Sequence, residues 1–397
     1  MPHRLSLVRR LALLRRAYTG ETDSSLLPVV TSGVQRLTAD DRALLHEILD
    51  HNHMARLFGH DEMPPPPPHV RQALLHDTTD PAQQELESAV LSAAGKAVNY
   101  LYLRQPADLG RPARIFRMVR PGRDEMVLHL YGGVLGPLLA ELMPREIGGA
   151  VTGVPGLRAE VCRRHVDLYL VDQPQARIML SNVSWRHWTA ALTFVDRVIG
   201  SLGELAWLGN DPTPLTEAEQ FTMATRHRAP GPVALNSALL RRGGVFRDVR
   251  WWRAWTRGRT TTTIEWPTES AVSVLPASDT AEPRPVAASL HLGTVARLLL
   301  HPLFGIPGHS PRPHYFHNDR LTLTIPDHDN GDARSGVVEL VLRPHNPDQD
   351  DGDPFAGLSW RDASDAWTDF QRVLAAPNPT FPRPATAPKP GPHQNRT

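Results

Sequence analysis

Hydrophobic residues recur at helical spacing near the start of the chain, so residues 1–62 are predicted to form a helical N-terminal segment. Residues 38–41 read Thr-Ala-Asp-Asp, a pattern typical of the first turn of a helix. Leu44, Leu45, Ile48 and Leu49 follow at helical period and predict the buried face of that helix.

Residues 4–16 alternate pairs of arginines with leucines and predict a basic amphipathic helix. Leu7, Leu11 and Leu14 share one face of this helix. Two interpretations are open: the leucine face packs on the rest of the protein, or residues 4–16 contact a membrane surface.

A longer pattern of strands and helices occurs twice. Leu-His-Leu ends a strand-like run at residues 128–130 and again at 290–292, and an apolar helix-like stretch follows at 134–143 and 295–304. Further strand-like runs lead to Ser-Trp-Arg at 184–186 and 359–361, where a last helix begins, and Trp185 and Trp360 are expected at equivalent buried positions. The pattern predicts an α+β fold of two tandem related halves, each a mostly antiparallel sheet with packed helices, plus the helical N-terminal segment.

Proline-rich stretches suggest where these parts are joined. Residues 64–68 are five successive prolines, which favour an extended spacer, and the chain becomes proline-rich and polar again from Ala376. We therefore expect a helical segment at 1–62, a proline-rich linker at 63–80, the first half at 81–208, a helical connector at 209–234, the second half at 235–375 and a disordered tail at 376–397.

Composition narrows the class of protein without naming a function. The formal net charge is +1, so no global field draws the chain to nucleic acid or membrane. The only cysteine, Cys162, permits no disulfide within the chain, which suits a reducing compartment, and no apolar run reaches the roughly 18 residues of a spanning helix. We expect a cytoplasmic protein without a transmembrane segment. The near-absence of lysine and the abundance of Arg, Ala, Pro and Gly are typical of proteins encoded by high-GC genomes.

The strongest local anomaly is an arginine- and tryptophan-rich segment at residues 241–259. Guanidinium groups match phosphates and aromatic faces stack on unpaired bases, so the segment is a candidate site for single-stranded nucleic acid. A half-buried strand with arginines stacked on tryptophans within the protein explains the same pattern. The candidate binding residues are Arg241, Arg242, Arg247, Arg250, Trp251, Trp252, Arg253, Trp255, Arg257 and Arg259.

Histidines supply a second, weaker candidate, a metal site. Histidines and carboxylates also gather at residues 46–53, but without the spacing of a zinc protease helix. Four imidazoles in one proline-rich stretch could reach a single tetrahedral metal ion, although a solvated loop explains them as well. These four are His301, His309, His314 and His317.

Motifs that would indicate a cofactor are missing. The chain has no phosphate-binding Gly-Lys-Ser/Thr loop, no Gly-x-Ser-x-Gly elbow and no Cys-x-x-Cys pair, so we expect no cofactor. The favoured interpretation is a non-enzymatic binding protein whose partner is a single-stranded nucleic acid or another protein. The alternatives are a metal-dependent hydrolase or nuclease using the His/Asp clusters, and a structural or assembly protein.

Overall fold

The computed structural model describes residues 5–51, 53, 63, 65–97, 115–200, 204–205, 213–225, 233–246, 253–257, 261–269, 298–306, 316–317, 320–326, 337–345 and 361–376. Within these ranges, residues 150, 204–205, 246, 253–257, 261–269, 316–317, 320–326, 337–345 and 361–364 are described by their backbone only.

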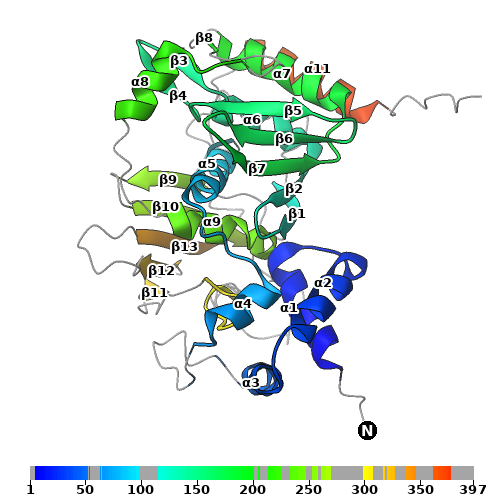
Figure 1. Ribbon diagram of the computed structural model, residues 1–397. Coiled ribbons are helices and arrows are strands. Elements are labelled where there is room, and N and C mark those ends of the chain that lie inside the picture. Colours follow the sequence, from blue (N-terminus) through cyan, green and yellow to red (C-terminus); the bar gives the residue numbers. More distant parts are fainter. Residues whose placement is uncertain are drawn as a thin grey trace, which may run out of the picture.

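Helices and strands alternate along this part of the chain (Figure 1). The helices are α1 (Leu7–Thr19), α2 (Asp23–Gln35), α3 (Ala39–Asp50), α4 (Pro68–Leu74), α5 (Pro81–Ala97), η4 (Gly132–Val134), α6 (Leu135–Leu142), α7 (Trp185–Ile199), α8 (Glu217–Thr225), α9 (Val233–Leu240), η6 (Gly243–Phe246) and α11 (Arg361–Ala375). The strands are β1 (Phe116–Pro121), β2 (Met126–Leu130), β3 (Arg145–Ile147), β4 (Ala150–Thr152), β5 (Leu157–Val161), β6 (His165–Leu170), β7 (Gln173–Ser181), β8 (Glu204–Leu205), β9 (Arg253–Arg257), β10 (Thr261–Glu269), β11 (Phe316–His317), β12 (Arg320–Pro326) and β13 (Val337–His345). The α+β class is confirmed.

The first large sheet has the strand order β1-β2-β7-β6-β5. Strands β2 and β7 run parallel, and the other neighbours are antiparallel. Strands β6 and β7 form a hairpin in which Val166 pairs with Leu180 and Leu168 with Ile178, and all four residues are buried. This alternation of buried and more exposed positions is what a strand with one face on the core requires.

The second large sheet has the order β11-β12-β13-β10-β9, with β10 and β13 parallel and the other neighbours antiparallel. In each sheet, the first two strands along the chain are antiparallel neighbours. Three further strands complete the sheet, and the last of these lies beside the second strand and parallel to it. In the second sheet β10 occupies the position of β2. The predicted counterpart at residues 290–292 lies outside the described part of the chain, as do Ser359 and Trp360.

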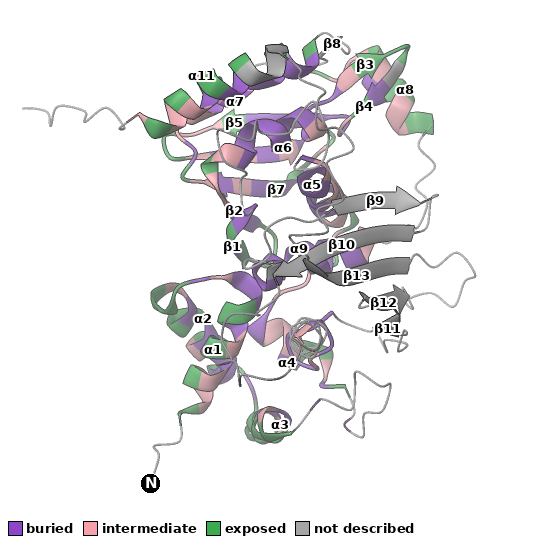
Figure 2. Cartoon of the chain, turned by 180° about the vertical axis from the view of Figure 1, so that it is seen from behind, coloured by how far each residue is buried: buried purple, intermediate pink, exposed green. Residues whose placement is uncertain are grey.

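Helix α5 lies between the two large sheets, where it contacts α6, α9, β7 and β9 (Figures 1 and 2). Its buried residues surround the helix and include Leu86, Glu87, Val90, Leu91 and Ala94. A helix buried on all sides contacts several elements at once, so α5 joins the two sheets. A small third sheet, β4-β3-β8, lies beside α8.

The N-terminal helices pack on the rest of the protein. Leu11 is fully buried, and Leu7 and Leu14 are partly buried against the core, so the packing expected for the leucine face is confirmed. The capping box predicted before α3 is present, because Thr38 Oγ1 accepts from the Asp41 amide and Asp41 Oδ2 accepts from the Thr38 amide. Among the described helices, none is long and apolar enough to cross a membrane.

Part of the predicted linker is helical. Pro68 opens α4, a position that tolerates proline because the first amide of a helix has no partner within it. Val70 and Leu74 are buried, and Leu75 follows them into the core. The second half of the span 63–80 therefore belongs to the folded body.

Candidate functional site

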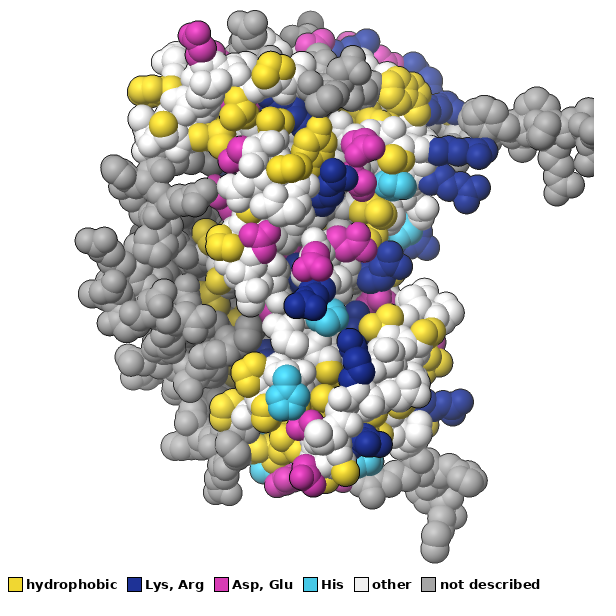
Figure 3. Space-filling model, in the orientation of Figure 1, with side chains coloured by type: hydrophobic (Ala, Val, Ile, Leu, Met, Phe, Trp, Pro, Cys, Tyr) yellow, Lys and Arg dark blue, Asp and Glu magenta, His cyan; other side chains and the backbone are white. Residues whose placement is uncertain are grey.

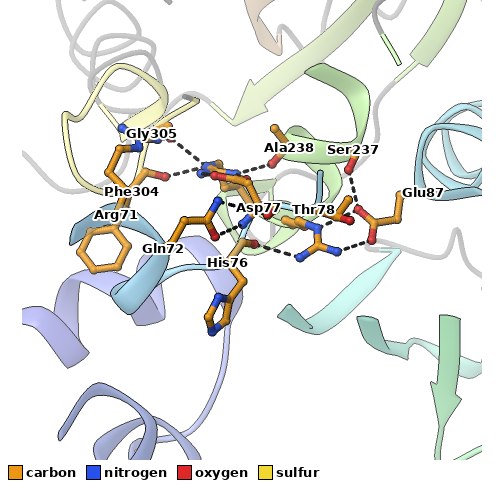
Figure 4. Close-up of polar contacts among 12 residues, drawn as sticks. Arg71, Gln72, His76, Asp77, Thr78, Glu87, Ser237, Ala238, Phe304 and Gly305 are labelled. Carbon is orange, nitrogen blue, oxygen red and sulfur yellow. Dashed lines mark hydrogen bonds and ion pairs between the residues drawn. The ribbon is translucent and has the colours of Figure 1, made fainter. Parts of the chain in front are cut away.

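Arg241 and Arg242 are both fully buried. Arg241 donates from Nε and Nη2 to Glu87 Oε2 and Oε1, at 2.8 and 2.6 Å. Its Nη1 donates to the carbonyl oxygens of His76 and Gly122, at 2.9 and 2.8 Å. The Arg241 guanidinium is thus committed to contacts inside the protein, and Figure 4 labels two of its partners, His76 and Glu87.

Glu87, on α5, accepts two further hydrogen bonds. Ser237 Oγ donates to Oε2 at 2.6 Å, and Gln83 Nε2 donates to Oε1 at 2.8 Å. A buried carboxylate is costly unless it is both paired and hydrogen-bonded, and Glu87 meets both conditions. The cluster joins α5 to α9 and to the segment after it.

Arg242 forms a second buried cluster beside the first. Its Nη1 and Nη2 donate to Asp77 Oδ1 and Oδ2, at 2.6 and 2.9 Å, a bidentate pair. Its Nε donates to the carbonyl oxygens of Phe304 and Gly305, at 2.6 and 3.0 Å, and Arg71 Nη2 donates to the same Gly305 oxygen at 2.6 Å. Burial opposes ionisation of Asp77, but the charge and hydrogen bonds of Arg242 outweigh it, so the pKa of Asp77 lies below its ordinary value.

These contacts revise the interpretation of the arginine- and tryptophan-rich segment. Arg241 and Arg242 hold the interior together and leave neither of their guanidinium groups for an external phosphate. Arg253, Trp255 and Arg257 lie on β9, at the edge of the second sheet, and only their backbone is described. The remaining candidates, Arg247, Arg250, Trp251, Trp252 and Arg259, lie outside the described residues.

His301, one of the four histidine candidates, lies beside a histidine that the sequence analysis did not group with it. The ring of His301 lies 5.1 Å from that of His53, and His53 lies 5.0 Å from His51. His309 and His314 lie outside the described residues, and His317 is on β11, where only the backbone is described. Among the residues that the structure describes, no group of three or more His, Cys, Asp or Glu side chains could hold a metal ion.

Several polar side chains lie at one end of the first sheet, although the sequence analysis did not group them. Strands β2, β7 and β5 end there, and β1 and β6 begin there, because of their parallel and antiparallel pairing. Asn182 follows β7 with a φ of 60°, the only positive φ of a non-glycine residue in the described part of the chain. Its Nδ2 donates to His129 Nε2 at 2.7 Å. Strained backbone of this kind is often found at functional sites.

The surroundings of two histidines at this end favour the neutral form. Burial, and then the charge of Arg117, lower the pKa of His129. Burial and the charge of Arg186 lower the pKa of His187, against a hydrogen bond to the backbone of Asn182 that raises it. A neutral His129 can accept the hydrogen bond from Asn182, so the geometry and the charge state agree.

The positive charge at this end comes from arginines. Arg117 is exposed at the start of β1, Arg163 and Arg164 are exposed in the turn between β5 and β6, and Arg186 is half-buried in the first turn of α7. Trp185, which was expected to be buried, is 54% exposed. It is the first residue of α7 and comes four residues after the end of β7. Figure 3 shows Lys and Arg side chains along the right-hand margin of the upper part of the molecule, where this sheet lies. We call the set Arg117, Arg163, Arg164, Trp185 and Arg186 the basic edge.

No protein-family model, curated protein or solved structure matches this chain.

The Leu-His-Leu and Ser-Trp-Arg motifs indicated a repeat in the sequence, but sequence reasoning missed that the first copies meet at one end of the sheet. The basic edge could have been predicted from the positions of its arginines relative to the ends of strands and helices. Arg117, Arg163, Arg164 and Arg186 each lie within two residues of a strand or helix terminus.

Proposed function

We propose that this chain is a non-enzymatic binding protein and that its partner is a single-stranded nucleic acid, bound at the basic edge. The observation that carries the proposal is that Arg117, Arg163, Arg164 and Arg186 lie at the same end of the first sheet as the exposed side chain of Trp185. Guanidinium groups bind phosphates, and an exposed indole stacks on an unpaired base.

The dimensions of the basic edge support a strand as partner. The first sheet places β1 and β5 four strand spacings apart, which is roughly 19 Å at the usual separation of neighbouring strands. Arg117 lies at one side of this row, and Arg163 and Arg164 lie at the other. A row of this length can contact several successive phosphates, whereas a small anion would need only one or two of the arginines.

We also propose that the chain contains an internal duplication. The matching strand order and the matching parallel and antiparallel pairing of the two large sheets support it. The remaining arginines and tryptophans of residues 247–259 stay candidates for a contribution of the second half to binding.

The proposal is tested by fluorescence anisotropy with a labelled poly(dT) oligonucleotide over a series of salt concentrations. The triple variant Arg117→Ala/Arg163→Ala/Arg164→Ala should bind more weakly. The slope of log affinity against log salt concentration should be shallower by about 0.7 for each phosphate that the variant no longer binds. Trp185→Ala should weaken binding by the value of one stacked base, about 1–3 kcal/mol.

The matched control is Arg9→Ala/Arg16→Ala/Arg36→Ala, which removes the same charge from exposed positions of the N-terminal helices. Equal weakening by both triple variants would show that only net charge matters and would refute the site. Absence of binding by the unmodified protein at low salt would refute the function. Binding of an acidic peptide in place of the oligonucleotide would assign the edge to a protein partner.

A further inference from the structure

Two histidines lie at the same end of the first sheet as the basic edge. His129 is on β2 and His187 is in the first turn of α7, and both side chains are half-buried. Asn182 connects them, because its Nδ2 donates to His129 Nε2 at 2.7 Å and its backbone is hydrogen-bonded to the side chain of His187. The two imidazoles are therefore held in place by a single residue.

Each of these histidines has an arginine of the basic edge beside it. The register of β1 on β2 shifts at Arg117, so that Arg117 and Met118 together face His129 across the ladder. Arg186 directly precedes His187 in α7. The charge of each arginine acts on the neighbouring imidazole, so a phosphate bound by either guanidinium adds a negative charge to the same surroundings.

The carboxylates near this end of the sheet face other partners. Glu160 Oε2 on β5 lies 3.5 Å from Arg177 Nη1, and Asp167 Oδ2 on β6 lies 3.8 Å from His165 Nε2. Among the residues that the structure describes, no carboxylate forms an ion pair with either histidine of the Asn182 cluster. The other titratable groups here are Tyr131, which follows β2, and Cys162, Arg163 and Arg164, in the turn between β5 and β6. A bound phosphate would therefore supply a negative charge that the protein does not itself pair with these two histidines.

We infer that binding of a single-stranded nucleic acid at the basic edge is coupled to proton uptake by His129 and His187, so that the complex becomes tighter as the pH falls. The inference rests on the proposed function, because it concerns the regulation of the same site.

The sign follows from the charges around the two imidazoles. In the free protein, burial and then the neighbouring arginine charge lower the pKa of each histidine. A phosphate beside these arginines acts in the opposite direction, since an opposite charge within about 4–6 Å favours the protonated form. The pKa of each histidine should therefore rise on binding. Linkage then requires the affinity to increase as the pH falls from the bound pKa towards the free pKa.

Fluorescence anisotropy with labelled poly(dT), from about pH 8 to about pH 5.5 at constant salt, measures this coupling on the full chain. The phosphodiesters of poly(dT) stay ionised over this range, so a change in affinity reports on the protein. Each histidine that takes up a proton should raise the affinity by up to about tenfold per pH unit. The double variant His129→Gln/His187→Gln should lose this rise when its affinities are compared with its own value at about pH 8.

The matched control is His69→Gln, because His69 is 63% exposed and lies 3.1 Å from Asp41 in the N-terminal helical segment. This variant should keep the full pH dependence, and an equal loss in the control and in the double variant would overturn the inference.

Calorimetry on the unmodified protein gives a second measurement that needs no variant. Proton uptake makes the apparent binding enthalpy depend on the ionisation enthalpy of the buffer, so titrations with poly(dT) near pH 6 in two buffers of different ionisation enthalpy should give different heats. Binding with the same affinity at every pH and the same heat in both buffers would refute the coupling and leave the proposed function standing. Absence of binding at every pH would refute both.

Discussion

Replacing Arg241 with alanine should destabilise the protein more than any exposed arginine substitution. The change leaves the Glu87 carboxylate fully buried without its charge partner and removes the two hydrogen bonds of 2.8 and 2.6 Å. It also removes the donor from the carbonyl oxygens of His76 and Gly122. Breaking a buried pair in this way costs about 3–5 kcal/mol, roughly a fifth or more of the 5–15 kcal/mol that stabilise a typical domain.

Urea unfolding at neutral pH, followed by far-ultraviolet circular dichroism, measures this loss. Arg372→Ala is the control, because Arg372 also pairs with a carboxylate, at 2.7 Å, but is 72% exposed. An exposed pair contributes about 0–1 kcal/mol, so this variant should stay close to the unmodified protein.

The double variant Arg241→Met/Glu87→Leu tests the cause of the loss. It leaves neither charge alone in the interior, so its cost should be less than the sum of the costs of Arg241→Met and Glu87→Leu. A loss below about 1 kcal/mol for Arg241→Ala, or simple additivity in the double variant, would refute the reasoning that an uncompensated charge is responsible.

Three further changes test other parts of the structure by the same unfolding assay. Leu11→Ala should cost about 2–5 kcal/mol because Leu11 is fully buried, whereas Leu13→Ala, at a position 51% exposed, should stay within about 0.5 kcal/mol. Gly33→Ala should destabilise the protein despite the better helix propensity of alanine, because its Cβ would lie 2.2 Å from the Ala73 carbonyl oxygen; a gain in stability would contradict this packing. The lowered pKa of Asp77 means that its ion pair stabilises the fold above about pH 4 and is lost as the pH falls below it. The stability difference between the unmodified protein and Asp77→Asn should therefore be constant near neutral pH and shrink in acid, and a difference that grows in acid would reverse the assigned sign.

Local sequence patterns predicted local structure well. The capping box at Thr38 and the leucine face of α1 depend on residues close together in sequence, and both are present. The α+β class followed from the alternation of strand-like and helix-like runs. These features depend on short-range chemistry, which a single sequence contains in readable form.

Long-range pairings could not be predicted in the same way. Arg241 binds Glu87, which lies 154 positions earlier in the sequence, and Arg242 binds Asp77, which lies 165 positions earlier. Nothing in the spacing of residues 241–259 distinguishes an arginine that enters the interior from one that meets a phosphate. Trp185 shows the converse: the repeated Ser-Trp-Arg motif predicted a buried side chain, but this first residue of α7 is exposed.

The distance along the chain between Glu87 and Arg241 has a consequence for synthesis. Chains are made at about 5–20 residues per second, so Arg241 is added roughly 8–30 s after Glu87. Throughout that interval α5 lacks both α9 and the guanidinium that neutralises its carboxylate. The N-terminal part of a growing chain therefore cannot complete its fold during this interval. The surface of α5 that later becomes buried is meanwhile accessible to the ribosome, to chaperones and to other nascent chains.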